Sequence, residues 1–513
     1  MQSHGRGEPL TRLTHAVLQP GFEGTEAPDW VRRRIAEEGL AAVVLFGRNI
    51  RSPEQVARLT SALRAENPDL IIAIDEEAGD VTRMEAWTGA SRPGNLALGA
   101  VDDPALTESV AHDIGRELHA AGISLNYAPS ADVNSNPRNP VIGVRSFGPA
   151  TDLVARHTAA WVRGLQSAGV AACAKHFPGH GDTAVDSHHD LPRVTASAEE
   201  IAATALPPFT AAMEAGVRVV MTGHLLVPAL DPELPATLSP RILDDLLRGT
   251  LGFDGLVVTD GIEMSAVTGR YGIDGATVRA VAGGADAVCV GGESADETTT
   301  DLLTTALAKA VHDGTLPEER LARAASRVAE FAAWSGRRAR SRTAANGVRS
   351  DIGLVAARRA LRVVGRPDGT LPLPADPHVV ELVPTSTLAI DRQTPWGVAG
   401  PLRELRPGAT SVRLTQPDLA ADADLLDRTA LTPATGRPLV VVVRDAARHA
   451  WMSDALNRLL AGRPDAVVIE MGVPGSTSPG AVHLATHGAT RVSGQAAAEL
   501  LAGVGDSPFP PPS

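Results

Sequence analysis

The segment from Lys175 to Pro192, KHFPGHGDTAVDSHHDLP, holds four histidines and three aspartates within eighteen residues. So many titratable groups are not typical of a hydrophobic core. The segment follows the apolar run 170–174, which has the pattern of a buried strand. Loops at the carboxyl ends of strands often carry the chemistry of α/β enzymes, because the strand is rigid and the loop can reach a substrate. We therefore take this segment as the candidate active-site loop.

Asp186 and His188 lie two residues apart in this loop. In an extended chain they point the same way, so the Asp186 carboxylate can bind one imidazole nitrogen of His188 and present the other for acid/base chemistry. Two alternatives stay open: the pair only holds the loop together by a hydrogen bond, or the loop binds zinc or iron without a fixed ligand spacing. The residues available for such a metal site are His176, His180, Asp182, Asp186, His188 and His189.

Two further carboxylates stand at the ends of apolar runs. Asp260 follows GLVVT and can act as a nucleophile, although aspartate is also a favoured helix cap and Glu263 is a competing carboxylate one turn later. Asp75 ends a second run, and Arg83 lies eight residues on. A carboxylate and a guanidinium together suit a polyhydroxylated ligand, because one accepts and the other donates hydrogen bonds. A surface ion pair is the alternative interpretation.

Composition limits the class of protein. The chain has 513 residues, 43% hydrophobic and 21% charged, which is enough for two or three globular domains. Its net charge of −13, without a basic and aromatic stripe, argues against nucleic acid as a partner. We find no apolar run near the roughly eighteen residues of a membrane span and no apolar core of a signal peptide. Cys173 and Cys289 lie in apolar runs, so we expect no disulfide, a reducing compartment and a cytoplasmic location.

Lysine is rare in this chain. Of the 47 basic residues only Lys175 and Lys309 are lysines. Because arginine is used almost everywhere else, the retained lysine at position 175 indicates that a compact ammonium group is needed there.

Apolar runs alternate with amphipathic stretches along the first 335 residues. The predicted strands are 16–19, 41–46, 70–74, 123–128, 170–174, 217–222, 256–259 and 287–290, and the predicted helices are 28–38, 53–65, 103–121, 152–168, 198–215, 240–251, 274–283, 298–311 and 317–334. Polar side chains stand at several strand ends, among them Asp75, Lys175, His224 and Asp260. This pattern favours a TIM (β/α)8 barrel over a doubly wound sheet, because barrel enzymes hold their active sites at that rim.

The predicted fold class is α/β, with the N-terminal barrel followed by a smaller α/β sandwich domain. We place the catalytic barrel at 1–335, an arginine-rich linker at 336–350 and the C-terminal domain at 351–513. In the C-terminal domain we predict strands at 361–364, 379–383, 439–443 and 466–471, and helices at 352–360, 451–461 and 493–501.

Together these segments resemble glycoside hydrolase family 3, and within it the β-N-acetylglucosaminidase (NagZ-type) branch. The resemblance covers Asp75–Arg83, Asn139–Gly148, Lys175–Pro192 and Val257–Met264, in the order of the family. The DSH triplet within the histidine-rich segment marks this branch rather than the β-glucosidases.

The resemblance implies a retaining mechanism. Asp260 matches the nucleophile that forms a glycosyl-enzyme intermediate, and His188, paired with Asp186, matches the acid/base. No metal and no organic cofactor is implied. Five residues match those that hold the non-reducing GlcNAc: Asp75, Arg83, Arg145, Lys175 and His176.

One segment departs from the family pattern. Where similar enzymes carry a DQEGGRVQR-like sequence, this chain has DEEAGDVTR, so Ala78 and Asp80 replace a glycine and a basic residue. We therefore expect a different loop after Asp75 and a different leaving-group preference. Since every matched residue lies before position 265, we expect the second domain to have a supporting role.

We thus expect an exo-acting β-N-acetylglucosaminidase that removes terminal GlcNAc from muropeptides or chitin-type oligosaccharides, with a role in peptidoglycan recycling. The nearest alternative is a phosphorylase with phosphate as co-substrate, because a histidine acid/base tolerates an incoming anion. A sugar-binding protein without activity and a metal-dependent hydrolase are further alternatives.

Overall fold

The computed structural model describes residues 9–183, 191–292, 294–339, 350–365, 370–385, 390 and 393–504. The chain divides into two compact units. The first takes in the described residues of Met1–Glu77, Thr107–Ile142 and Pro149–Val348, and the second those of Ala78–Leu106, Gly143–Gly148 and Arg349–Ser513. The domain limits predicted from the sequence, 1–335, 336–350 and 351–513, stay predictions.

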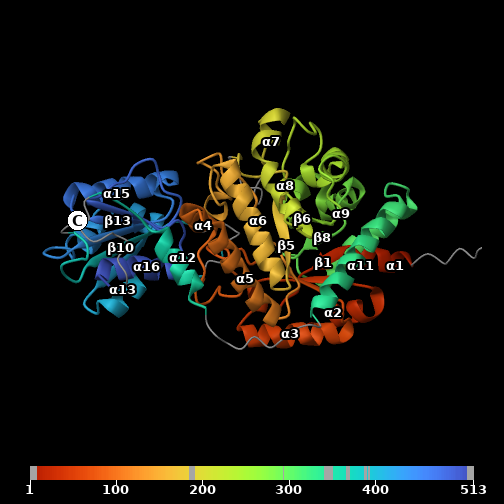
Figure 1. Ribbon diagram of the computed structural model, residues 1–513, viewed down its shortest axis with the longest axis horizontal. Helices are drawn as coiled ribbons and strands as arrows, with labels where there is room; N and C mark the ends of the chain where they lie inside the picture. Colours follow the sequence, from red (N-terminus) through yellow and green to blue (C-terminus); the bar gives the residue numbers. More distant parts are fainter. Residues whose placement is uncertain are drawn as a thin grey trace, which may run out of the picture. The chain divides into compact units, whose positions relative to one another are not determined.

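Short parallel strands form the centre of the first unit (Figure 1), and the described residues of that unit contain eight of them. They are β1 (Leu18–Pro20), β2 (Ala42–Leu45), β3 (Ile71–Ile74), β4 (Leu125–Asn126), β5 (Ala171–Phe177), β6 (Val219–Thr222), β7 (Leu256–Thr259) and β8 (Val288–Val290). Strands β2 to β7 pair in chain order in one curled sheet, and β1 pairs with β8. A parallel bridge between Val258 and Ala287 connects β7 to the chain entering β8. The eight predicted strands and the barrel-type fold are confirmed.

Helices follow the strands of this unit. They are α1 (Leu10–Ala16), α2 (Asp29–Arg33), α3 (Pro53–Glu66), α5 (Pro104–Ala120), α6 (Thr151–Ser167), α7 (Ala198–Thr204), α8 (Pro207–Glu214), α9 (Ser265–Gly283), α10 (Glu297–His312) and α11 (Glu318–Ala339). Short 3-10 segments span Gly47–Asn49 and Ala236–Leu238, and π-helical segments span Arg34–Glu38 and Arg241–Thr250. Helices α6 and α8 pack against β5 (Figure 1).

Four helix predictions need correction. The helix predicted over 198–215 is two helices, because Pro207 and Pro208 remove backbone donors and begin α8 as a new helix. The helix predicted over 274–283 is part of the longer α9, which bends at Gly272, where φ is +67°. Two predicted helices are π-helical in part: the one over 28–38 from Arg34 to Glu38, and the one over 240–251 from Arg241 to Thr250.

The interior of the barrel is filled by side chains from the inner faces of its strands. Ile71 and Ala73 of β3 and Ala171 and Cys173 of β5 belong to one buried cluster that also includes residues of β2, β4, β6, β7 and β8. Alternate residues of a strand point to the same side, so each of these short strands contributes one or two side chains to this cluster. This packing makes the barrel a rigid support for the loops at its rim.

The second unit contains a six-stranded sheet in the order β11-β10-β12-β13-β14-β9, in which only β9 is antiparallel to its neighbour. Its strands are β9 (Arg362–Gly365), β10 (His378–Val383), β11 (Thr410–Thr415), β12 (Leu439–Val443), β13 (Val467–Glu470) and β14 (Val482–Ala485). Its helices are α4 (Asn95–Val101), α12 (Ile352–Ala360), α13 (Ala399–Leu405), α14 (Gln416–Ala421), α15 (Ala450–Gly462) and α16 (Arg491–Ala502), with short 3-10 segments at Gly143–Arg145 and Ala446–Arg448 and a π-helical segment at Asp427–Leu431.

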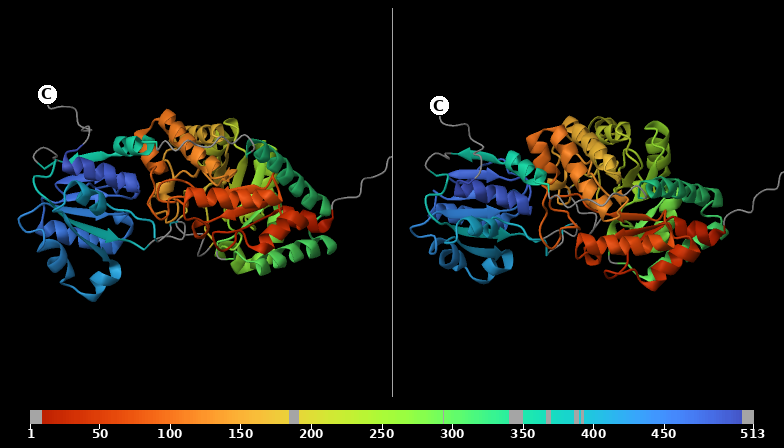
Figure 2. Two further views of the ribbon diagram at one scale, coloured as in Figure 1. Left: turned by 90° about the horizontal axis from the view of Figure 1, so that it is seen from below. Right: turned by 60° about the horizontal axis from the view of Figure 1, so that its bottom comes forward.

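Helices cover both faces of this sheet (Figure 2). The strand β12, LVVVV, shows why: Val440 and Val442 pack in one buried cluster with residues of α13 and α16, whereas Val441 and Val443 pack in another with residues of α15. A strand that is buried on both faces needs a continuous apolar run. The predicted smaller α/β domain is confirmed as a fold class.

Candidate active site

Three predicted site residues stand at the ends of alternate strands of the parallel sheet. Asp75 follows β3, Lys175 lies near the end of β5, and Asp260 follows β7. Because β3, β5 and β7 run parallel in one curled sheet, their carboxyl ends meet at the same rim of the barrel. The fold therefore brings these three residues to one end of the first unit.

Lys175 is buried between two carboxylates. Its Nζ atom lies 2.5 Å from Oδ1 of Asp75 and 2.6 Å from Oε1 of Glu77, and only 2% of its side chain is exposed. An ammonium group out of contact with water needs such partners to offset its desolvation. Glu77 is as buried as the lysine, whereas 22% of the Asp75 side chain is exposed. Asp75 is thus the member of the cluster that a ligand can reach.

His176 is oriented by Asp132, a residue that the sequence did not single out. Its Nδ1 atom lies 2.7 Å from Oδ2 of Asp132, whose carboxylate is buried. The carboxylate can only accept, so Nδ1 carries the proton and the tautomer of the ring is fixed. The register of β5 against β6 shifts between Ala174 and Phe177, and such an irregularity re-aims side chains near active sites.

Asp132 also holds the start of the histidine-rich loop. Its carboxylate accepts hydrogen bonds from the backbone amides of His176, at 3.3 Å, and His180, at 2.6 Å, and from the hydroxyl of Ser130, at 3.0 Å. Burial by itself would raise the pKa of this carboxyl, but its interaction with His176 and these hydrogen bonds outweigh burial and lower the pKa. Asp132 therefore acts as an ionised anchor.

Both flanks of the loop are tied to the first unit. On one side the ring of His180 lies 2.7 Å from the hydroxyl of Thr183, and Asn139 donates to the His180 carbonyl at 2.8 Å. A Cβ at position 181 would lie 1.7 Å from the Val133 carbonyl oxygen, which explains the glycine there. On the other side, the amide of Val194 donates a hydrogen bond to the carbonyl of Leu226, in the loop after β6, at 2.9 Å.

The predicted acid/base residues Asp186 and His188 lie outside the described residues, as does His189. Their roles therefore stay predictions. No group of His, Cys, Asp and Glu in the part of the chain that the structure describes is arranged to hold a metal ion. The metal hypothesis also needs the three residues just named, so it stays a hypothesis.

Asp260 is held at the end of β7 by hydrogen bonds to backbone groups. Its amide donates to the Thr222 carbonyl of β6 at 3.1 Å, and its Oδ1 accepts from the Gly261 amide at 2.8 Å. The Gly261 carbonyl in turn accepts from Nε2 of His224 at 2.9 Å. The carboxylate is thus oriented by rigid neighbours, as a nucleophile requires.

Glu263 has a different environment from Asp260. Its Oε1 accepts from the amides of Gly291, at 3.2 Å, and Gly292, while its buried Oε2 has no hydrogen-bond partner among the described residues. Burial raises the pKa of this carboxyl, and the charge of Asp260 raises it further. These contacts indicate that Glu263 anchors the chain after β8.

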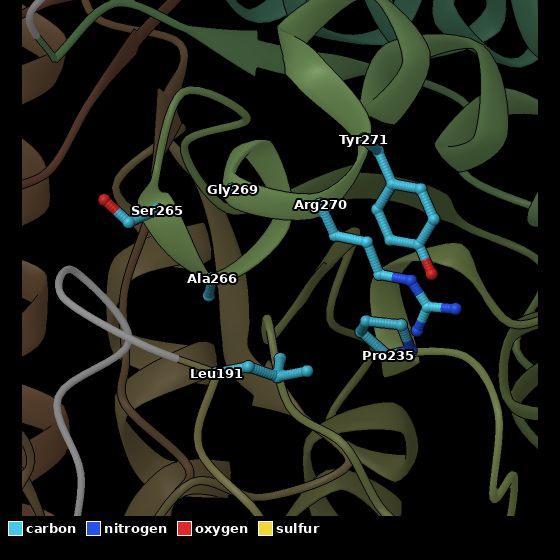
Figure 3. Close-up of a pocket in the computed structure, with 7 residues that line it drawn as sticks. All are labelled: Leu191, Pro235, Ser265, Ala266, Gly269, Arg270 and Tyr271. Atoms are coloured by element: carbon cyan, nitrogen blue, oxygen red, sulfur yellow. The ribbon is translucent and has the colours of Figure 1, made fainter.

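A cavity of about 350 Å³ lies beside the start of α9 (Figure 3). The Arg270 guanidinium stands 5.2 Å from the centroid of the Tyr271 ring, and that of Arg279, which does not line the cavity, stands at 5.0 Å. The buried hydroxyl of Tyr271 has no hydrogen-bond partner in the described part of the chain. The lining residues are Leu191, Pro235, Ser265, Ala266, Gly269, Arg270 and Tyr271.

The two predicted substrate-binding arginines belong to the second compact unit. Arg83 lies in Ala78–Leu106 and is half-buried, and Arg145 ends the turn Gly143–Arg145 and is buried. Their spacing in the sequence gave no sign that they pack with the C-terminal region. The structure therefore brings Asp75, Lys175, His176 and Asp260 to one rim and places these arginines in the other unit.

A barrel of parallel strands with polar residues at its carboxyl rim defines a (β/α)8-type enzyme. Residues 17–331 match the model of the glycosyl hydrolase family 3 N-terminal domain. The chain belongs to glycoside hydrolase family 3 and is a glycoside hydrolase, so the predicted family is confirmed.

Relatives match over most of the chain. The β-hexosaminidase A of Pseudoalteromonas piscicida is 33% identical over 435 residues, which cover 78% of this chain and 71% of the relative. A solved family 3 β-N-acetylglucosaminidase of Paenibacillus sp. is 33% identical and covers 98% of both chains with a TM-score of 0.83. A fungal multi-domain β-N-acetylglucosaminidase of this family is 28% identical, with a TM-score of 0.86 over 98% of this chain and 62% of its own. No helix among the described residues is both long and apolar enough to cross a membrane.

Proposed function

We propose that this chain is a retaining exo-β-N-acetylglucosaminidase with Asp260 as its nucleophile. The observation that carries the proposal is the placement of the Asp260 carboxylate at the end of β7, oriented by the Gly261 amide at 2.8 Å. The names of the relatives, β-hexosaminidase and β-N-acetylglucosaminidase, support the choice of sugar.

The proposed reaction has two steps. In the first, an oxygen of Asp260 attacks the anomeric carbon, the bond to the leaving oxygen breaks, and a protonated His188 gives that oxygen its proton. In the second, His188 takes a proton from water, and the resulting oxygen attacks the anomeric carbon and releases Asp260. Two inversions give GlcNAc with retained configuration. Asp186 stabilises the imidazolium that is present before the first step and forms again in the second.

A histidine acid has an electrostatic consequence. Once it has given its proton to the leaving group it is neutral, so it adds no second negative charge close to Asp260. A carboxylic acid in the same role would become an anion. The same property would tolerate phosphate as an attacking group, which makes phosphate dependence a necessary part of the test.

The terminal sugar is proposed to bind at the Lys175 cluster. Asp75, partly exposed, accepts hydrogen bonds from sugar hydroxyls, while Lys175 holds its carboxylate in place at 2.5 Å. His176, whose Nδ1 is held by Asp132, is a further donor or acceptor for the sugar. Arg83 and Arg145 are proposed as ligands of the same GlcNAc on the basis of the family resemblance.

The cavity lined by Arg270 is a candidate for the leaving-group side. Leu191 follows directly on the segment of His188, and Ser265 lies five residues after Asp260. A guanidinium suits an acidic leaving group such as the muramyl peptide of a muropeptide, more than a neutral chitin-type sugar. We therefore favour muropeptides and a role in peptidoglycan recycling. The free, buried state of both cysteines supports the proposed cytoplasmic location.

The first test measures initial rates on an aryl β-GlcNAc and on the matching aryl β-glucoside, each with and without phosphate. Release of GlcNAc that is independent of phosphate supports the hydrolase. A rate that rises with phosphate and yields GlcNAc-1-phosphate would make the protein a phosphorylase, and binding of GlcNAc without any turnover would make it a sugar-binding protein.

The second test addresses the assigned residues. A fluorinated GlcNAc donor that slows the second step should add one glycosyl mass to the protein, on the peptide that contains Asp260. His188→Ala should slow substrates with poor leaving groups far more than aryl substrates, because only the former need protonation. Labelling at another carboxylate, or equal losses for both substrates, would contradict these roles.

A further inference from the structure

Two segments that interrupt the barrel sequence pack with the C-terminal region. Residues Ala78–Leu106 follow the loop after β3, and Gly143–Gly148 follow the loop after β4, yet both form one compact unit with Arg349–Ser513. They carry Arg83 and Arg145, for which the proposed function includes binding of the terminal sugar. The inference below rests on that part of the proposed function.

A buried ion pair fixes the first segment. Nη2 of Arg444 lies 2.5 Å from Oδ2 of Asp80, with 8% and 1% of the two side chains exposed. Oδ1 of Asp80 accepts from the Ala489 amide at 2.8 Å. Arg444 directly follows β12, and Ala489 comes just before Thr490, the N-cap of α16. Asp80 thus binds at the carboxyl edge of the second sheet, where open parallel sheets commonly bind ligands.

Asp80 is three residues before Arg83 and departs from the family pattern, in which a basic residue is usual. Burial raises the pKa of the Asp80 carboxyl, and the charge of Arg444 and the Ala489 amide oppose that rise. An aspartate buried in this way needs its cation, because an unpaired buried charge is costly. The departure at position 80 is therefore matched by Arg444.

Further contacts hold the rest of the segment. Nη2 of Arg491 lies 3.9 Å from Oε1 of Glu85, and its Nε donates to the Gly89 carbonyl at 3.3 Å. At the far end, Arg359 lies 2.9 Å from Asp103. The segment is therefore tied to the start of α16 both before and after Arg83, and to α12 after it.

The turn that carries Arg145 is tied to the same segment. Nδ2 of Asn95 donates to the Arg145 carbonyl at 2.7 Å, and this contact is buried. A Cβ at Gly99 would lie 1.8 Å from the Phe147 carbonyl oxygen, so the turn approaches α4 directly. A shift of the first segment therefore moves the Arg145 turn as well.

We propose that Asp80 and Arg444 are positioning residues through which the C-terminal domain sets the place of the two substrate-binding arginines. Neither residue takes part in bond breaking. The second domain then contributes to sugar binding through the segment it holds, although its own residues do not include the predicted catalytic groups. The Asp80–Arg444 ion pair would then be the contact through which the second domain has its expected supporting role.

The test compares Asp80→Asn, Arg444→Gln, Arg444→Lys and the Asp80→Asn/Arg444→Gln double variant of the full chain. We expect KM for an aryl β-GlcNAc and the inhibition constant of free GlcNAc to rise about tenfold in the first two, with kcat within about threefold. Arg444→Lys should recover part of the loss because it keeps the charge. The double variant should be no worse than the poorer single variant, since both remove one contact.

The matched control is Arg458→Ala, which removes an exposed ion pair with Asp427 in the same unit but outside the segment that carries Arg83, and should leave KM unchanged. Melting midpoints of all variants show whether each is folded. Because three single variants test the same ion pair, the proposal can still be tested if one of them does not fold. Unchanged KM in folded Asp80→Asn and Arg444→Gln, additive losses in the double variant, or losses confined to kcat would each overturn the proposal. If the wild-type chain itself releases no GlcNAc, the proposed function fails, and that outcome is distinct from these.

Discussion

The Nζ atom of Lys175 lies 2.5 Å from Oδ1 of Asp75, although the two residues are 100 positions apart. Glu77 adds a second carboxylate at 2.6 Å, and the buried cluster lies at the ends of β3 and β5. The space holds a compact ammonium group, which explains why this arginine-rich chain keeps a lysine there.

Lys175→Arg should therefore lower kcat/KM for an aryl β-GlcNAc by about 100-fold or more, because a planar guanidinium displaces the two carboxylates. The measurement is steady-state kinetics on folded protein. The control is Lys309→Arg, which changes the other lysine of the chain on the exposed side of α10, where it pairs with Asp313. Equal activity of the two variants would show that the ammonium at position 175 is not required.

Asp260 and Glu263 provide a matched pair of carboxylates. Asp260→Asn should reduce turnover by about 1,000-fold or more, because an amide cannot form the glycosyl intermediate. Glu263→Gln should keep much more activity, since its amide oxygen can still accept from the Gly291 and Gly292 amides. Initial rates and melting midpoints are measured for both. A larger loss in Glu263→Gln would assign the nucleophile to Glu263 instead.

Variants of Arg270 and Arg279 can show whether Arg270 acts by stacking on the Tyr271 ring or by binding a ligand. Both guanidinium groups stand over the Tyr271 ring, but only Arg270 lines the cavity beside α9. Arg270→Ala should raise KM about tenfold for a substrate with an acidic leaving group and leave KM for a neutral chitin-type disaccharide within about twofold. Arg279→Ala should change neither. The same loss for both substrates would remove Arg270 from the choice of leaving group.

Sequence patterns located the barrel because each of its strands is a short apolar run, such as IIAI before Asp75 and LVVT before Asp260. The rule that polar residues at strand ends carry chemistry also found Asp75, Lys175 and Asp260. It missed Asp132 because β4 ends at Asn126, and the chain continues irregularly for five residues before that aspartate. Only the contact with His176 reveals its role.

The second unit shows a different limit of sequence reasoning. The strand β11, TSVRLT, was not predicted because most of its residues are at least partly exposed and its pattern is polar. Nor could the sequence show that Asp80 meets Arg444, since they are 364 positions apart. Local periodicity reports burial of one element, whereas a pairing of distant charges depends on the complete fold.

His487 should make the second unit less stable in acid. It is buried after β14 with φ of +58°, and its Nδ1 donates to the Ala360 carbonyl at 3.1 Å. Burial, together with the charge of Arg362, lowers its pKa to about 4 from the ordinary value of 6.5. Between these values the unfolded chain binds a proton that the folded chain does not, so the free energy of unfolding falls as pH falls, by up to about 3 kcal/mol.

His487→Asn should remove this acid sensitivity, because asparagine tolerates positive φ and does not titrate. The wild-type melting midpoint should drop between about pH 7 and about pH 5, and the drop should be smaller in the variant. His312→Asn, at the exposed end of α10, is the control and should keep the wild-type pH dependence. If His487→Asn loses as much stability in acid as the wild type, then the neutral state of this imidazole does not stabilise the fold, and another buried group must account for the pH dependence.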